Sequence, residues 1–252
     1  MDRNCFLKRT TMEFKRLFIE EKPIIGMIHL NNAHGETVLE RAKKEIEIYF
    51  QYGIYPLVEN YFGSVDDCEE VLKWLKENHK EKKYGINILG NYHKAFELAM
   101  RYDAKFIQID SVCGHLPLEA DKKYGISLNN LRKENDIVLL GGVRFKYCNV
   151  LSGRSVEEDL RIGMTRCDAI VCTGTGTGCA TPFDKVDMFK SVLGDFPVIT
   201  GAGVTLETAK ETMEHCDGFI IGSWLKHTHM DTGFVSEDNV HKLYDIVGNK
   251  KA

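Results

Sequence analysis

The sequence predicts an α/β protein with a (β/α)₈ barrel, or TIM-barrel, fold. Eight short runs rich in Ile, Val and Phe recur along its 252 residues, with amphipathic segments of helical spacing between them. Strands that are almost continuously apolar and alternate with helices lie parallel, with both faces covered. Eight such units in a chain of this length favour a closed barrel. A doubly wound open sheet is the competing architecture, but it normally has fewer strands and a nucleotide loop after the first one.

The predicted elements follow one another in a regular order. The eight predicted strands are Ile24–Leu30, Ile54–Glu59, Tyr84–Leu89, Lys105–Asp110, Ile137–Val143, Asp168–Thr173, Pro197–Thr200 and Gly218–Ile221. Helix start signals lie between them. Ser64 and Ser155 each precede an acidic residue by three positions, as in a capping box, and Ser236 is typical of an N-cap. Thr181-Pro182 predicts an N-cap followed by a proline in the first helical position.

The first 22 residues predict an extension that precedes a single barrel domain over residues 23–252. Phe14, Leu17 and Phe18 fall on one face of a helix. A transit peptide would be poor in acidic residues, whereas this segment contains Glu13 and Glu20. We therefore expect an amphipathic helix that caps one end of the domain.

Composition narrows the class of partner. Apolar residues make up 43% of the chain and charged residues 28%, which is enough for a large core. The net charge of −4, with both signs spread along the sequence, excludes a basic surface for nucleic acid. No apolar run approaches the roughly 20 residues that span a bilayer, so no membrane partner is expected. The pattern favours a small-molecule ligand.

Each of the last three predicted strands is followed by a loop rich in glycine. Glycine lets a backbone N–H approach a phosphate oxygen closely, and phosphate sites of such barrels commonly use the loops after the last strands. The predicted phosphate-binding residues are Gly174 and Gly176 in TGTGTG, Gly201, Ala202 and Gly203 in TGAGVT, and Gly222 and Ser223 in IGSWLK. The TGTGTG loop matches neither a dinucleotide fingerprint nor a P-loop, so an ordinary flexible loop remains its alternative. For the other two, the alternative is turns that only permit helix entry.

Polar side chains lie at or near the ends of the first five strands. They are His29, Glu59 with Asn60, Asn87, Asp110 and Lys146. One such residue is usually a hydrogen-bonded structural group, but several that converge on one rim predict an active site. Carboxylates beside a lysine in a partly dry pocket have shifted pKa values suited to proton transfer. Lys146, if held neutral, could also form a Schiff base.

Other groups carry weaker signals. No cofactor is predicted, although a divalent metal held by His29, Glu59 and Asp110 is left open. The pair His227 and His229 is interpreted as part of a solvated loop. The eight cysteines form no Cys-x-x-Cys pair, which indicates reduced thiols and a cytoplasmic protein.

Several motifs together resemble the BtpA/SgcQ family. They are GMIHL, VEN, NILGNYHKAFELAMRYDAKFIQID, CDAIVCTGTGTG, VITGAGV and CDGFIIGSWLK, which cover most of the chain from about Pro23. The family is similar to phosphate-binding TIM barrels, and its members are linked to photosystem I accumulation and to sugar-related operons. The resemblance implies site residues at His29, Glu59, Asn60, Asn87, Lys146, Gly174, Gly201, Gly203, Gly222, Ser223 and Lys226. Trp224 in the last motif is expected either to wall the phosphate end or to plug the barrel.

The chain departs from the family pattern in three loops. Tyr61–Asp67 replaces a glycine-aspartate-proline type of loop after VEN, Tyr147 replaces a histidine after Lys146, and residues 111–130 are altered. These loops shape the substrate end of the pocket.

Two classes of function follow. The first is an enzyme that acts on a small phosphorylated metabolite, a sugar phosphate or nucleotide, by lyase or isomerase chemistry. The alternative is a non-catalytic ligand-binding or assembly factor of the BtpA type. The ionisable residues at the early strands favour the enzyme. The outer helices of barrels often pair, which favours a homo-oligomer.

Overall fold

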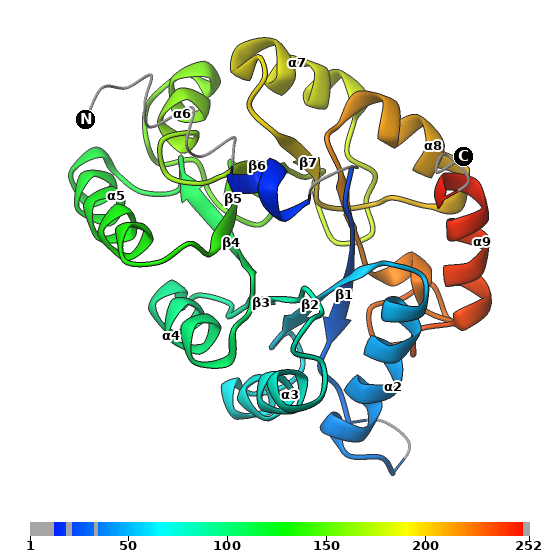
Figure 1. Ribbon diagram of the computed structural model, residues 1–252. Coiled ribbons are helices and arrows are strands. Elements are labelled where there is room, and N and C mark those ends of the chain that lie inside the picture. Colours follow the sequence, from blue (N-terminus) through cyan, green and yellow to red (C-terminus); the bar gives the residue numbers. More distant parts are fainter. Residues whose placement is uncertain (1–12, 19–21, 33–34, 249–252) are drawn as a thin grey trace.

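The computed structural model describes residues 13–18, 22–32 and 35–248, which form a closed barrel (Figure 1). Its eight strands follow the chain order, and each neighbouring pair, including β8 with β1, is parallel. The strands are β1 (Ile24–His29), β2 (Tyr55–Glu59), β3 (Gly85–Asn87), β4 (Phe106–Cys113), β5 (Val138–Val143), β6 (Ala169–Cys172), β7 (Val198–Thr200) and β8 (Phe219–Ile221). The predicted (β/α)₈ fold is confirmed.

Helices surround this barrel on the outside, as Figure 1 shows. They are α2 (Val38–Gln51), α3 (Val65–Asn78), α4 (Tyr92–Tyr102), α5 (Leu118–Lys133), α6 (Val156–Gly163), α7 (Phe183–Leu193), α8 (Leu206–His215) and α9 (Glu237–Val247), with the short 3₁₀ helix η1 (Ser223–Leu225) after β8. No helix in the described part of the chain combines the length and apolar character that crossing a membrane requires.

The capping signals of the sequence are largely confirmed. Ser64 and Ser155 form capping boxes at α3 and α6, and Ser236 caps α9. The expected cap of α7 differs by one position. Pro182 itself is the N-cap and makes no side-chain cap hydrogen bond, while the Thr181 hydroxyl donates to the Ala202 carbonyl at 3.0 Å. The Thr181 side chain thus links the loop after β6 to the loop after β7.

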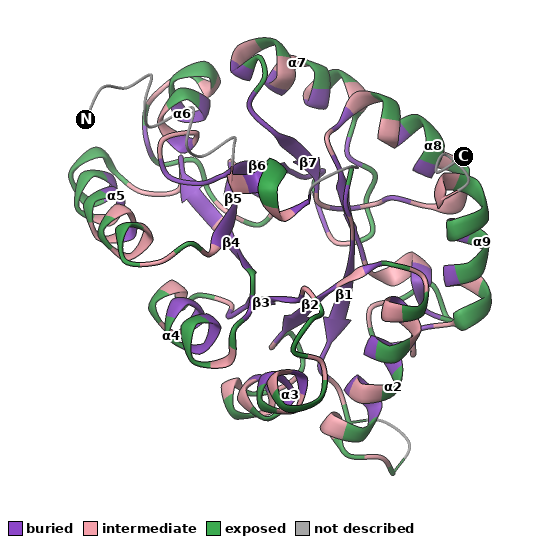
Figure 2. Ribbon diagram, in the orientation of Figure 1, coloured by how far each residue is buried: buried purple, intermediate pink, exposed green. Residues whose placement is uncertain are grey.

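Side chains along the strands belong alternately to two buried clusters, because successive side chains point to opposite faces. One set fills the barrel interior and includes Leu57, Phe106 and Leu140, while another set, such as Ile28 and Ile107, packs beneath the surrounding helices. Figure 2 shows the strands buried and the outer helix faces exposed. The interior is therefore packed with side chains, and only its ends are available for a site.

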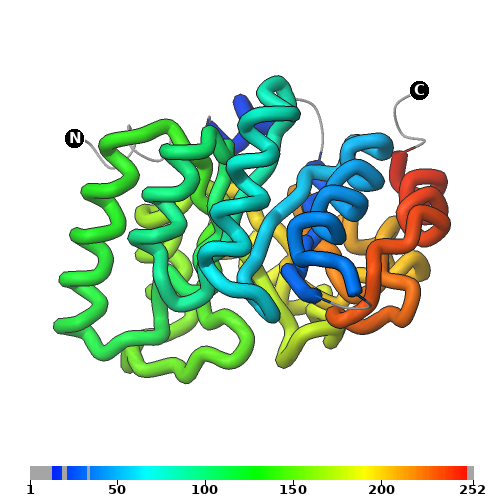
Figure 3. Tube along the Cα trace, turned by 90° about the horizontal axis from the view of Figure 1, so that it is seen from below, coloured from blue at the N-terminus to red at the C-terminus, as the bar shows by residue number. Residues whose placement is uncertain are grey.

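The N-terminal capping helix is present as a short helical segment over residues 13–17. Phe14 and Phe18 are 4% exposed and belong to the interior cluster of the barrel. The Phe18 ring lies 5.1 Å from that of Tyr55 and 5.6 Å from that of Phe106, both in the first residue of a strand. The segment thus closes the N-terminal end of the barrel, opposite the loops that follow β5 and β6 (Figure 3).

Candidate functional site

A cavity of about 340 Å³ opens at the end of the barrel where the strands finish. Its volume is in the range of small-ligand pockets. The lining combines strand ends with the loops that follow them. It consists of Met27, His29, Glu59, Tyr61, Leu89, Gln108, Asp110, Phe145, Lys146, Tyr147, Thr177, Gly178, Gly201, Ala202, Gly203, Val204, Thr205, Ile220, Gly222, Ser223, Trp224 and His229.

Two carboxylates of this cavity are joined by side-chain amides. The Asn87 amide nitrogen donates to Glu59 Oε1 at 2.8 Å and to Asp110 Oδ1 at 3.1 Å. Gln108 Nε2 also donates to Asp110 Oδ1, at 3.1 Å. Asn87 is 1% exposed, so it lies beneath the carboxylates and supports them rather than lining the cavity. The amides hold both carboxyl groups at defined positions, Glu59 at the end of β2 and Asp110 within β4.

Glu59 and His29 have strongly shifted pKa values. Burial, followed by the charge of Asp110, raises the pKa of the Glu59 carboxyl to about 8, against the opposing effects of Asn87 and Lys146. Burial, followed by the charge of Lys226, lowers the pKa of His29 to about 3. His29 Nε2 lies 3.6 Å from Glu59 Oε2. At neutral pH this pair is therefore a protonated carboxyl beside a neutral imidazole, rather than an ion pair.

Lys146 reaches the cavity from the loop after β5. Its ammonium donates to Thr177 Oγ1 at 3.1 Å, and its backbone N–H donates to Thr173 Oγ1 at 2.9 Å. Thr177 also donates its backbone N–H to the Tyr147 hydroxyl at 2.7 Å. The loops after β5 and β6 are thus joined above the cavity, and the charge of Lys146 acts on both His29 and Glu59.

The loops after β7 and β8 present backbone N–H groups without acceptors. Among the described residues, none accepts a hydrogen bond from the backbone N–H of Ala202, Gly203, Val204, Ser223 or Trp224. All five residues line the cavity. Ala202 and Val204 are buried, whereas Gly203, Ser223 and Trp224 are partly exposed, so these five donors are available to a group that enters the cavity.

The structure brings most of the predicted site residues together. His29, Glu59, Asp110, Lys146, Gly201, Ala202, Gly203, Gly222, Ser223 and Trp224 all line the cavity. Asn60, Gly174 and Gly176 do not. The Asn60 side chain accepts the backbone N–H of Leu89 at 2.8 Å, and a Cβ at Gly174 would lie 2.5 Å from the Ala180 carbonyl. A Cβ at Gly176 would lie 3.1 Å from the Tyr147 hydroxyl.

Lys226, which the family resemblance placed at the site, lies outside the cavity. Its side chain is 0% exposed, and Nζ lies 3.2 Å from Glu45 Oε2 on α2. Arg41 binds the other oxygen of the same carboxylate at 3.0 Å. The short helix η1 turns the chain after β8, so that Lys226 points toward α2 and ties the following segment to that helix.

Several lining residues were not assigned to the site by the sequence analysis, among them Gln108, Thr177 and His229. Gln108 lies within an apolar run, but it precedes Asp110 by two positions and therefore faces the same side of β4. Thr177 lies in the glycine-rich loop. His229, which was interpreted as part of a solvated loop, lines the cavity, and its ring lies 4.4 Å from that of Trp224.

Gly203 has a positive φ of 71°, and a Cβ there would lie 2.2 Å from the Cys179 carbonyl oxygen. A larger residue at this position would therefore displace the neighbouring loop instead of filling the space of a ligand. No cluster of three or more His, Cys, Asp or Glu side chains suited to hold a metal ion occurs within the described residues.

The fold and the cavity define a (β/α)₈-barrel protein with a polar pocket at the carboxyl ends of its strands. The chain belongs to the BtpA family, which it matches over residues 20–249. An uncharacterized protein of Archaeoglobus fulgidus is 32% identical over 247 residues, which are 88% of this chain and 97% of the relative. The Photosystem I biogenesis protein BtpA of Synechocystis is 24% identical over 243 residues, which are 85% of this chain and 84% of the relative.

Solved structures resemble the chain in fold. The tryptophan synthase subunit alpha from Legionella pneumophila superposes with a TM-score of 0.63 at 11% identity, covering 97% of this chain and 98% of that one. The N-(5'-phosphoribosyl)anthranilate isomerase from Pyrococcus furiosus gives a TM-score of 0.60 at 13% identity, covering 91% and 100%. At such identities the likeness concerns the barrel architecture and not the residues of the site.

Proposed function

We propose that this protein is an enzyme that binds a small phosphorylated metabolite and transforms it by acid–base chemistry of the isomerase or lyase type. One observation carries the proposal: the same cavity combines five backbone N–H groups without acceptors and, from other strands, a buried acid–base pair. The names of two neighbours in fold, the phosphoribosylanthranilate isomerase and the thiamine phosphate pyrophosphorylase of Pyrococcus furiosus, support a phosphorylated substrate.

The phosphate end of the ligand is assigned to the loops after β7 and β8. Backbone N–H groups bind phosphate oxygens without the entropy cost of ordering a long side chain. The hydroxyls of Ser223 and Thr205 add neutral donors at the same wall of the cavity. Lys146, across from these loops, supplies the positive charge that a phosphate dianion favours.

The reacting end of the ligand is assigned to His29, Glu59 and Asp110. A carboxyl with a pKa of about 8 carries its proton at neutral pH, so Glu59 can act as a general acid. The lowered pKa of His29 keeps its imidazole neutral, so it can serve as a hydrogen-bond partner for the ligand. The Asp110 carboxyl, held by Asn87 and Gln108, provides a second acid–base group in the same cavity. Isomerase and lyase reactions require a proton to leave one atom and another to reach a second atom, which this set can provide.

A non-catalytic ligand-binding or assembly role is the second candidate, favoured by the biogenesis name of the Synechocystis relative. Such a role requires the phosphate-binding loops but not the buried Glu59 carboxyl, whose pKa is shifted because it lies in a dry environment beside another acid. Buried acids of this kind are concentrated at catalytic sites. The enzyme proposal accounts for both the phosphate end and the reacting end of the cavity.

The first test compares two nearly isosteric substitutions at Ser223. Ser223→Asp places a carboxylate beside the proposed phosphate, whereas Ser223→Asn adds a similar volume without charge. We expect the Asp variant to weaken binding of inorganic phosphate and of phosphate monoesters by about 100-fold or more relative to the Asn variant, as measured by calorimetry. Equal affinities of the two folded variants would reject the phosphate assignment.

The second arm tests catalysis with a panel of phosphorylated sugars and nucleotides, in which turnover is followed by mass spectrometry. Once a substrate is found, Glu59→Gln should lower kcat by about 10²–10⁴-fold and leave phosphate affinity largely intact. Lys146→Met should instead weaken phosphate-monoester binding by about tenfold. Phosphate binding without turnover of any panel member, together with unchanged affinity in Glu59→Gln, would favour the ligand-binding role.

A further inference from the structure

The loop between β5 and α6, which carries Lys146, has an unusual backbone. Arg144 and Tyr147, on either side of Lys146, have positive φ values of 49° and 63°. Residues with a side chain rarely adopt this left-handed conformation, and it persists where surrounding contacts hold it. The contacts that hold these two residues therefore determine where Lys146 lies.

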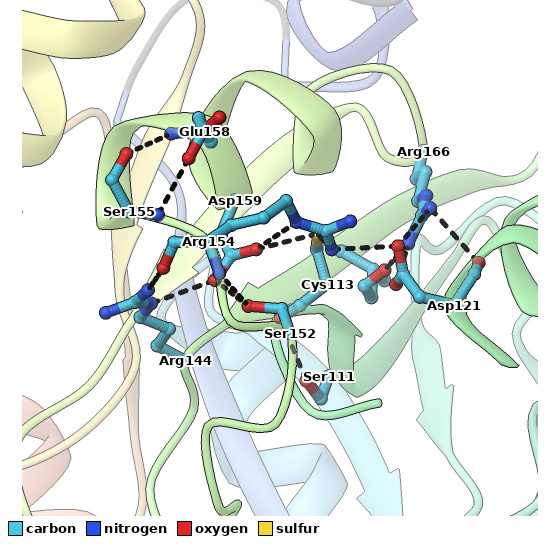
Figure 4. Close-up of polar contacts among 11 residues, drawn as sticks. Ser111, Cys113, Asp121, Arg144, Ser152, Arg154, Ser155, Glu158, Asp159 and Arg166 are labelled. Carbon is cyan, nitrogen blue, oxygen red and sulfur yellow. Dashed lines mark hydrogen bonds and ion pairs between the residues drawn. The ribbon is translucent and has the colours of Figure 1, made fainter. Parts of the chain in front are cut away.

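Arg144 is held from outside the barrel. Its Nε donates to Asp159 Oδ2 at 3.0 Å and its Nη2 donates to the Arg154 carbonyl at 2.6 Å (Figure 4). Its backbone N–H donates to the Cys113 carbonyl at 3.4 Å. The planar guanidinium fixes two hydrogen bonds in one orientation, which a lysine could not do.

Asp159 connects the beginning of this loop to its end. The carboxylate is 0% exposed, and besides Arg144 it accepts the Ser152 hydroxyl at 2.9 Å and Arg154 Nε at 2.8 Å. Figure 4 shows these donors converging on it. A buried carboxylate with several charge-assisted hydrogen bonds constrains its partners strongly.

Asp159 is itself rigidly placed. It lies in the first turn of α6, next to the capping box of Ser155 and Glu158. The network extends through Arg154, whose Nη2 donates to Asp121 Oδ2 at 2.8 Å, and Arg166 binds the other oxygen of Asp121 at 2.6 Å. The loop is thus tied to both α5 and α6.

We propose that Asp159 is a positioning residue: through Arg144 it holds the loop after β5 in the conformation that places the Lys146 ammonium at the cavity, 3.1 Å from Thr177 Oγ1. The use of Lys146 for phosphate rests on the proposed function, whereas its position does not. The experiment therefore examines Lys146 in the ligand-free protein.

The test uses two variants of the network and one control. Arg144→Gly removes the guanidinium but keeps a residue that adopts positive φ freely. Asp159→Asn keeps the shape of the carboxylate and removes its charge. Arg161→Gln removes an exposed arginine from the same helix and leaves the network intact. The reactivity of each lysine toward acetic anhydride is measured by peptide mass spectrometry, with exposed Lys210 as the internal reference.

We expect the Lys146 rate, relative to Lys210, to rise several-fold in Arg144→Gly and Asp159→Asn and to stay native in Arg161→Gln. A general loosening of the fold would raise the rates of many lysines together, so a selective change at Lys146 identifies positioning. If Asp159→Asn does not fold, the Lys146 rate in Arg144→Gly alone decides whether the proposal holds. A native Lys146 rate in folded Arg144→Gly would overturn the proposal.

Phosphate affinity separates this inference from the proposed function. Loss of one charge-assisted contact should weaken phosphate-monoester binding about tenfold in Arg144→Gly, but not in Arg161→Gln. Failure of the native protein to bind any phosphate monoester would reject the proposed function and leave the reactivity result intact. Native affinity in Arg144→Gly, together with a changed Lys146 rate, would reject the assignment of phosphate contact to Lys146.

Discussion

Burial of the Glu59 carboxyl makes the stability of the protein depend on pH. The group is 6% exposed, and its pKa rises from the ordinary value of 4.5 to about 8 in the folded chain. Between these values the folded state keeps a proton that the unfolded state has released. Unfolding is therefore increasingly favoured as pH rises through this range, and the effect levels off once both states are deprotonated.

Glu59→Gln removes this dependence because its amide does not titrate. We expect the variant to gain stability relative to the native protein as pH rises from about 4.5 to about 8, by a total on the order of a few kcal/mol. Urea denaturation at several pH values measures the difference. Glu81→Gln, at an exposed position, serves as the control and should show no comparable trend. A constant difference between Glu59→Gln and the native protein would show that the carboxyl is not held protonated.

At the scale of elements, the N-terminal helical segment covers the end of the barrel where the strands begin. Phe14 and Phe18 both insert into the interior cluster, while Lys15 between them is exposed. The Lys83 ammonium donates to the Leu17 carbonyl at 2.6 Å, which ties the segment to the chain just before β3. The apolar face predicted from the sequence is therefore part of the core.

Phe18→Ala should destabilise the protein by about 3 kcal/mol, because it removes a buried ring and leaves a cavity among aromatic neighbours. Chemical denaturation of the variant measures this loss. Lys15→Ala in the same helical segment provides the control and should change stability by less than about 0.5 kcal/mol. Similar values for the two variants would mean that the segment is not packed on the barrel in solution. The phosphate affinity should remain native, since the site lies at the opposite end.

The segment after β8 shows how one short element changes the role of a residue. The sequence places Lys226 four residues beyond Gly222, and a continuous strand end would leave it near the rim. A 3₁₀ turn at Ser223–Leu225 follows the strand, and Trp224 lines the cavity while Lys226 is buried against Glu45. Its charge still reaches the site, since it is the second cause of the lowered pKa of His29.

At the scale of the whole molecule, the closed barrel determines which thiols can react. Five of the seven described cysteines are buried, Cys148 is partly exposed and Cys179 is exposed. Burial raises the pKa of Cys172 to about 12, which keeps it protonated and unreactive. Cys5 lies outside the described residues.

Thiol titration tests this distribution of buried and exposed cysteines. The denatured protein, purified under protection from air, should show eight reactive thiols, because the sequence indicates that all are reduced. In a Cys5→Ser variant under native conditions, one thiol should react rapidly, and Cys179→Ser should abolish this fast phase. Fewer than eight thiols after denaturation would show that disulfides form. A fast phase that survives in Cys179→Ser would contradict the burial pattern.

The sequence by itself determined the barrel architecture and which residues lie near the carboxyl ends of its strands. Eight apolar runs alternating with amphipathic segments specify parallel strands covered by helices, and such strands bring all their carboxyl ends to one edge. This is why His29, Glu59, Asp110 and Lys146, far apart in the chain, could be expected in one pocket. The glycines after β7 and β8 could be assigned to it for the same reason.

Only the tertiary structure decided how these groups are used. The pKa values of Glu59 and His29 depend on burial and on charges from other elements, and no local pattern reveals that Asn87 lies between two carboxylates. The network of Asp159 and Arg144 likewise joins residues that have no shared motif. Side-chain direction after a strand end depends on the turn that follows, so Lys226 lies outside the cavity while His229 lines it. Periodicity encodes which face of an element is buried, whereas the environment of a site arises from contacts between elements distant in the sequence.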